Sequence, residues 1–109
     1  MTDVNEIVEE LVRQESEDDI GLWEVAAMVR DDLGLSTNEE VKASALDIVR
    51  GLLDHGLWPG DFDYGKSKIY FWNEPDTAAC LARIDREWDV TKGDPTLPES
   101  ICWFRSKQS

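Results

Sequence analysis

The sequence predicts a single α+β domain over residues 1–109, with three N-terminal helices, then a β-hairpin, a helix and a final strand. Two observations favour this class. Apolar residues recur every three or four positions as far as residue 56, which is the period of an amphipathic helix. After residue 56 the pattern changes to short runs rich in aromatic and β-branched residues, which favour strands. A length of 109 residues fits one domain, and 41% hydrophobic residues supply its core.

The first helix is expected over about residues 3–15. Its apolar stripe has helical spacing and consists of Val4, Ile7, Val8, Leu11 and Val12. This stripe can pack within the domain or in a dimer, and the sequence leaves both open. A second helix is expected over about residues 20–33, followed by Gly34 in the position where helices commonly end.

The third helix has the clearest boundaries in the sequence. Ser36 with Glu39, or Thr37 with Glu40, forms a capping box at its start. It is expected to end near His55, and its buried stripe is predicted to consist of Val41, Ala45, Ile48, Val49, Leu52 and Leu53.

A hairpin, a helix and a strand are expected in the second half. Residues 57–65 and 67–72 predict the two hairpin strands. Asn73 predicts a helix cap, with Pro75 in the first turn of the helix that follows. Residues 100–105 predict a final strand that extends the hairpin to a three-stranded antiparallel sheet.

Charge is the most informative feature for function. The chain carries 24 acidic and 11 basic residues, a net charge of −13. Residues 1–40 hold 13 of the acids and two of the bases, a net of −11, whereas residues 41–109 hold 11 acids and nine bases, a net of −2. This distribution indicates either a solvated face or a surface for a basic partner.

No catalytic, cofactor or metal site is expected. His55 is the only histidine, and it is predicted at a helix end. Cys80 and Cys102 lack the spacing and the further ligands of a zinc site, so we expect two thiols in a reducing compartment. Asp61 and Asp63 lack the remaining acids of a calcium loop, which favours a hairpin turn.

The N-terminal residues lack the basic and apolar regions of a secretory signal. No apolar run reaches the roughly 20 residues that span a bilayer. We therefore expect a cytoplasmic protein that does not enter a membrane.

Three helices followed by a hairpin is also the order of a winged helix, a fold that commonly binds DNA. Binding of this kind would centre on Lys42, Arg50, Lys66 and Lys68. However, Glu39 and the other acids of this chain would repel phosphates, so no nucleic-acid partner is expected. The fold is therefore predicted to be winged-helix-like without DNA binding as its main role.

A resemblance is carried by residues 47–57, 60–62, Trp72, residues 82–88 and residues 101–104. In these segments the chain resembles a group of small, acidic bacterial proteins of uncharacterised function. Some members of the group are encoded beside secreted polymorphic toxins and resemble immunity proteins. The resemblance implies an inhibitor role and supplies no catalytic residues.

The sequence therefore predicts a non-enzymatic acidic protein that neutralises a basic protein partner such as a toxin. The expected contacts are six carboxylates and one aromatic anchor, namely Glu6, Glu9, Glu10, Glu17, Asp18, Asp19 and Trp23. Two alternatives are a transcription-associated winged-helix-like module and a DNA mimic that inhibits a nucleic-acid-binding enzyme.

Overall fold

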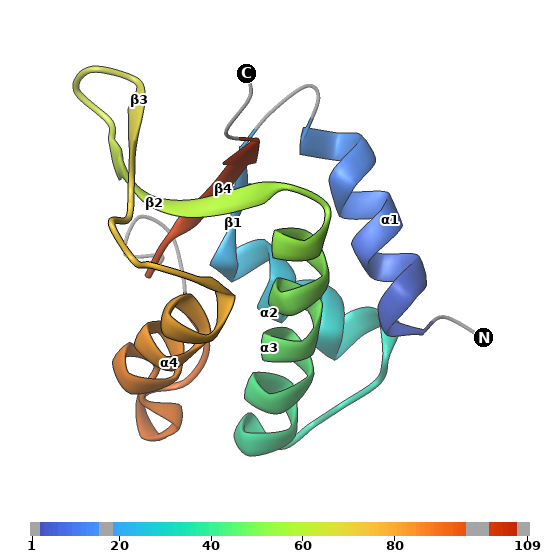
Figure 1. Cartoon of the computed structure of the whole chain (residues 1–109). Helices are drawn as coiled ribbons and strands as arrows, with labels where there is room; N and C mark the ends of the chain where they lie inside the picture. Colours follow the sequence, from blue (N-terminus) through green and yellow to red (C-terminus); the bar gives the residue numbers. More distant parts are fainter. Residues whose placement is uncertain (1–2, 16–18, 96–100, 107–109) are drawn as a thin grey trace.

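In the part of the chain that the computed structural model describes, four helices and one antiparallel sheet share a hydrophobic core (Figure 1). The structure describes residues 3–15, 19–95 and 101–106. The helices are α1 (Val4–Glu15), α2 (Leu22–Asp32), α3 (Asn38–Asp54) and α4 (Thr77–Glu87), and the short 3₁₀ helix η1 (Val90–Lys92) follows α4. The strands are β1 (Ile20–Gly21), β2 (Leu57–Asp63), β3 (Lys68–Phe71) and β4 (Trp103–Ser106). The α+β class is confirmed.

The sheet has four strands in the order β1-β4-β2-β3, one more than the sequence predicted. The final strand extends the hairpin as expected, because β4 pairs antiparallel with β2. The additional strand is β1, in which Ile20 lies opposite Phe104 of β4. Two residues are too few to show the alternation of a strand. That helix therefore begins at Leu22 and not at residue 20.

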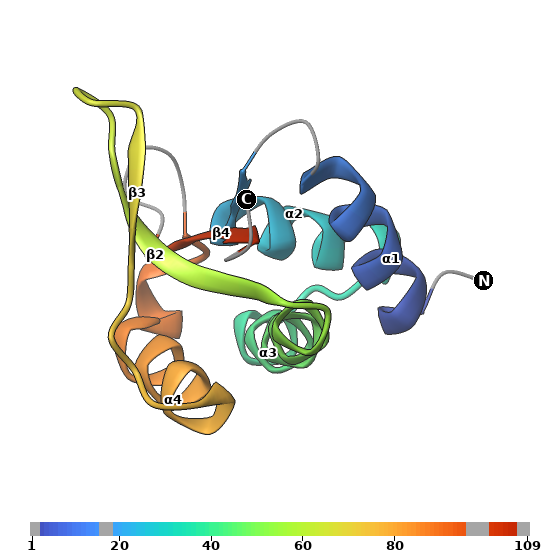
Figure 2. The same ribbon diagram turned by 45° about the horizontal axis from the view of Figure 1, so that its top comes forward.

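The central helix is α3, which lies between α1 and α4 in both views (Figures 1 and 2). Its buried residues are the six that the sequence predicted. Helix α1 packs closely on α3 at Gly51, where an added Cβ would lie only 2.7 Å from Cγ2 of Val8. Ile7 and Leu11 are also buried in the core, so the apolar stripe of α1 packs within the domain.

Side-chain caps fix the start of α3 and α4. The hydroxyl of Thr37 accepts the backbone N–H of Glu40 at 3.2 Å, so Thr37 is the N-cap of α3. The predicted cap at Asn73 is wrong, because Asp76 caps α4 by accepting the N–H of Ala79 at 2.9 Å. Pro75 therefore precedes the cap. The backbone N–H of Trp72 still donates to Pro59 in the sheet, so the chain needs residues 73–75 to reach the helix.

The two faces of the sheet have different surroundings. Successive residues of a strand point to opposite faces, so the pairing register assigns each side chain to one of them. Leu57 and Phe104 lie on the face that is buried in the core with the helices. Phe62 and Trp103 lie on the opposite face and are only partly buried. The β2–β3 hairpin projects from the rest of the fold in both views (Figures 1 and 2).

Candidate partner-binding surface

The carboxylates predicted on the first helix do reach the surface. Glu6 and Glu9 are exposed on α1, on the side away from its buried stripe. Glu10 is half-buried and forms an ion pair with Arg13, and it also accepts a hydrogen bond from Gln14 Nε2 at 3.4 Å. The bond from Arg13, and then that from Gln14, lowers the pKa of Glu10. Glu10 therefore stays ionised, but Arg13 partly neutralises its charge.

Asp19 has a structural role that the sequence did not reveal. Its two carboxylate oxygens accept hydrogen bonds from Nε and Nη2 of Arg105, each at 2.6 Å. The Asp19 side chain is only 11% exposed, and the ion pair joins the residue before β1 to β4. Asp19 therefore offers a partner little free charge. Glu17 and Asp18 lie outside the described residues.

Trp23 lies against the sheet in the first turn of α2 and is half-buried. A Cβ added to Gly21 would lie 2.5 Å from Cδ1 of Trp23 and 3.2 Å from Cζ3 of Trp103. Both indole rings therefore border the space above Gly21, where a side chain would collide with Trp23. The predicted anchor is thus part of a packed aromatic surface.

Some of the basic residues form ion pairs with carboxylates of the same chain. The recorded pairs of the described residues engage five cations, namely Arg13, Arg30, Lys42, Arg83 and Arg105. Apart from Glu10, the three N-terminal helices carry a set of exposed acids, called here the helical acids: Glu6, Glu9, Asp31, Asp32, Glu39, Glu40, Asp47 and Asp54. None of the ion pairs of the described residues involves a helical acid. Their negative charge therefore faces solvent.

The sequence reasoning named only two of the helical acids, Glu6 and Glu9, as contacts. Asp31 and Asp32 end α2, whereas Glu39 and Glu40 begin α3. Their contribution was visible in the net charge of −11 over residues 1–40. The net charge does not show which carboxylates form ion pairs with cations of the same chain.

The four bases of the winged-helix interpretation have different environments. Lys42 is 18% exposed and donates from Nζ to the carbonyl oxygens of Asp85 at 2.8 Å and Trp88 at 2.9 Å. It therefore binds the C-terminal end of α4 instead of facing solvent. Arg50, Lys66 and Lys68 are exposed, and Lys68 lies 5.2 Å from the ring centroid of Tyr70.

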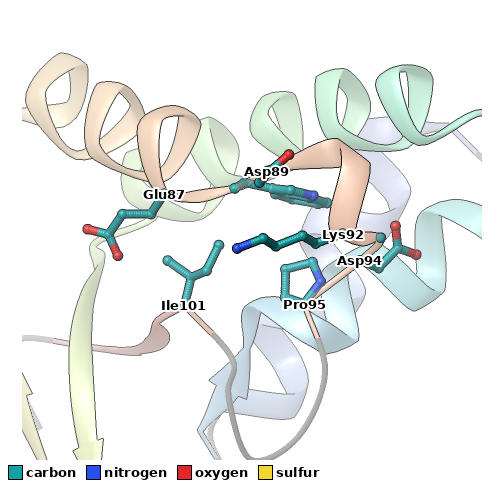
Figure 3. A pocket seen from close by; sticks show the side chains of 8 residues that line it. Glu87, Asp89, Lys92, Asp94, Pro95 and Ile101 are labelled. Carbon is teal, nitrogen blue, oxygen red and sulfur yellow. The ribbon is translucent and has the colours of Figure 1, made fainter.

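A pocket of about 210 Å³ lies beside η1 (Figure 3). Figure 3 shows Lys92 extending across it, with Pro95 and Ile101 on one side. The three carboxylates that line it already have bonds within the chain. Glu87 accepts from Arg83 at 2.8 Å, and Asp94 binds Arg30 at 2.5 Å.

The third carboxylate of the pocket, Asp89, accepts bonds from the hydroxyl and the N–H of Thr91. These bonds lower the pKa of Asp89. Glu87, Asp89 and Asp94 thus each accept hydrogen bonds from groups of the same chain.

The cysteines and acids do not gather into a metal site in the part of the chain that the structure describes. Cys80 and Cys102 are both buried as thiols. Burial, and then the nearby charge of Glu87, raises the pKa of Cys102 well above its ordinary value of 9.0. Asp63 accepts the N–H groups of Gly65 at 2.9 Å and Lys66 at 3.2 Å, which is the role expected in a hairpin turn.

Among the described residues, no helix has the length and apolar composition needed to cross a membrane. No protein-family model, curated protein or solved structure matches this chain. The resemblance to small acidic bacterial proteins therefore stays a prediction.

Proposed function

We propose that this chain is a non-enzymatic binding protein that neutralises a basic protein partner, such as a toxin domain, in the cytoplasm. One observation carries the proposal. The helical acids are exposed on α1, α2 and α3, and no recorded ion pair within the described residues neutralises them. Their field attracts cations and accelerates the approach of a positively charged protein.

A toxin that acts on nucleic acid presents lysine and arginine where it meets phosphates. An acidic protein can occupy that surface and exclude the nucleic acid by direct competition. Inhibition then needs no chemistry from the inhibitor.

The charge distribution also argues against duplex binding through α3. Lys42 is held by α4, and Glu39 and Glu40 are exposed in the first turn of the helix. A gel-shift titration at low salt should therefore show no retarded duplex. A retarded complex that loses affinity in Lys66→Ala would favour the winged-helix interpretation instead.

The test uses the whole chain as bait in a lysate of its source cell, with elution in rising salt. The recovered basic protein is then titrated with the wild-type chain and with the double variant Glu6→Gln and Glu9→Gln. We expect about a tenfold weaker Kd and a smaller salt dependence for this variant, since each exposed charge contributes modestly to steering and binding.

A matched control changes the net charge equally at another place. Ala78→Lys with Ala82→Lys raises the net charge by the same two units, but by adding positive charges on the exposed side of α4. This control should bind almost as tightly as the wild type. Equal loss in both double variants would show that only net charge matters, and unchanged affinity in both would overturn the proposal.

A further inference from the structure

The sheet face opposite the core carries a set of aromatic side chains from three strands and one helix. The set, called here the aromatic face, consists of Trp23, Phe62, Tyr64, Phe71 and Trp103. The pairing register places the strand residues together, because Phe71 and Trp103 both lie opposite Gly60 and Phe62 is two residues further along β2. Gly60 has no side chain, and the Cγ1 atom of Ile69 lies within 2.9 Å of the place that a Cβ would take there.

Three of these rings, those of Phe62, Tyr64 and Trp103, form a connected cluster. The centroids of Phe62 and Tyr64 are 4.9 Å apart, and those of Phe62 and Trp103 are 5.4 Å apart. Tyr64 and Trp103 meet edge to face at 6.2 Å. These spacings are those of favourable aromatic pairs, so the rings hold one another in place. Tyr64 is nevertheless 51% exposed and Phe71 is 37% exposed, which leaves ring surface for a partner.

One residue of the aromatic face belongs to the acidic N-terminal segment of the chain. Trp23 packs beside Trp103 above Gly21, and Trp23 belongs to the segment of residues 1–40 that carries a net charge of −11. Glu24, which follows Trp23, accepts the N–H of Gly21 at 3.3 Å. The Asp19–Arg105 ion pair lies on the adjoining part of β4. Aromatic side chains are enriched among the residues that contribute most to protein–protein binding.

Tyr70, on the other face of the sheet, and Trp72, just after β3, already accept cations within the chain. Arg83 stacks on Trp72 with 3.8 Å between its Cζ and the ring centroid, and Lys68 lies over Tyr70. A cation over an aromatic ring is attracted by the negative face of the ring, and guanidinium groups also stack on it. A net charge of −13 favours such a cation and opposes both a phosphate and a second copy of this chain.

We propose that the aromatic face is the docking surface for an arginine-rich segment of the basic partner, whose guanidinium groups stack on Tyr64 and Phe71. This inference rests on the proposed function and adds the place and the chemistry of the contact. The helical acids draw the partner toward the chain, and the aromatic face selects arginine over lysine.

The test compares nona-arginine with nona-lysine peptides, which carry equal charge. The wild-type chain should bind nona-arginine about five- to tenfold more tightly, because two stacked guanidinium groups each add a modest cation–π contribution. The double variant Tyr64→Ala and Phe71→Ala should lose this preference. Tyr70→Ala is the matched control, since Tyr70 is 44% exposed on the same strand as Phe71 but points to the other face.

A second measurement needs no variant. Nona-arginine should shift the indole N–H resonances of Trp23 and Trp103 in the wild-type chain more than that of Trp88, which is 2% exposed.

Two outcomes would overturn the aromatic docking surface and leave the proposed function intact. In the first, the wild-type chain binds both peptides tightly and without a preference for arginine. In the second, the preference for arginine survives in the double variant. Binding of neither peptide would contradict both. A dimer in sedimentation that Tyr64→Ala with Phe71→Ala dissociates would make a second copy the occupant and would also overturn this inference.

Discussion

Arg105 and Asp19 form a two-point ion pair across the length of the chain, with both N···O distances at 2.6 Å. The pair joins β4 to the residue that precedes β1. It thereby fixes the entry to α2, the helix whose first turn carries Trp23. Asp19 was predicted to contact a partner, but its carboxylate instead links two segments of the same chain.

Asp19→Asn should lower the free energy of unfolding by about 1–3 kcal/mol, because a partly buried guanidinium loses a charged, two-point acceptor. Urea unfolding followed by tryptophan fluorescence measures this change. Glu9→Gln is the control, since an exposed carboxylate outside the recorded ion pairs should change stability by less than about 0.5 kcal/mol. Equal stability of the two variants would mean that the Asp19–Arg105 pair does not stabilise the fold.

Gly51→Ala should destabilise the chain although alanine is the better helix former. An added Cβ would lie 2.7 Å from Cγ2 of Val8, so α1 and α3 must separate. We expect a loss of about 1–3 kcal/mol from overpacking, against a gain of about 1 kcal/mol in helix propensity.

The double variant Gly51→Ala with Val8→Ala supplies the control for this crossing. Val8→Ala alone removes buried methyl groups, but it also makes room for the new Cβ. The double variant should lose less free energy of unfolding than the two single variants lose together. Simple additivity would argue against contact between these two residues.

Lys42→Met should weaken the packing of α4 on α3. The ammonium group of Lys42 binds the carbonyl oxygens of Asp85 and Trp88, and a cation at a helix C-terminus is favoured by the helix dipole. We expect a loss of about 1–2 kcal/mol in urea unfolding. Amide hydrogen exchange should accelerate in α4 more than in α1.

Lys68→Met is the matched control for the Lys42 variant, because Lys68 is exposed and lies only over the ring of Tyr70. Its stability should stay within about 0.5 kcal/mol of the wild type. If both variants lost the same stability, the bonds of Lys42 to α4 would not be the cause.

The stability of the chain should fall as the pH rises above 9. Burial raises the pKa of the Cys102 thiol above its ordinary value of 9.0, so the unfolded chain releases this proton before the folded chain does. The protonated Cys102 thiol therefore makes its full contribution to the free energy of unfolding below pH 9. Above pH 9 this contribution is lost at up to about 1.4 kcal/mol per pH unit.

Urea unfolding of the wild type and Cys102→Ala at pH 8, 9 and 10 measures this effect. Cys102→Ala lacks the titrating thiol and should show a flatter decline, even though it begins from a lower stability. Parallel declines in both proteins would assign the pH dependence to other groups.

The helices could be predicted because their signals are local. The stripe of α3 and the Thr37 cap lie within one segment, and a period near 3.6 is visible without any tertiary contact. β1 could not be predicted, because Ile20 becomes a strand residue only by pairing with Phe104 near the other end of the chain. The cap of α4 was placed too early because Asn73 and Asp76 have similar capping chemistry.

For the candidate surface, too, only the features with local sequence signals could be predicted. Exposure of Glu6 and Glu9 followed from their position outside the stripe of α1. The engagement of Asp19 and Lys42 did not, because each binds a group from a distant segment. The meeting of Trp23 with Trp103 depends on the same unforeseen strand.

The position of β4 between β1 and β2 also sets an order of events during synthesis. The helices and the β2–β3 hairpin are made of neighbouring residues and can form as soon as they leave the ribosome. Until residues 103–106 emerge, Ile20 and Leu57 have no strand between them, and Phe104 is missing from the core. The nascent chain should therefore remain sensitive to protease until β4 has been released, and the domain should close in one late step.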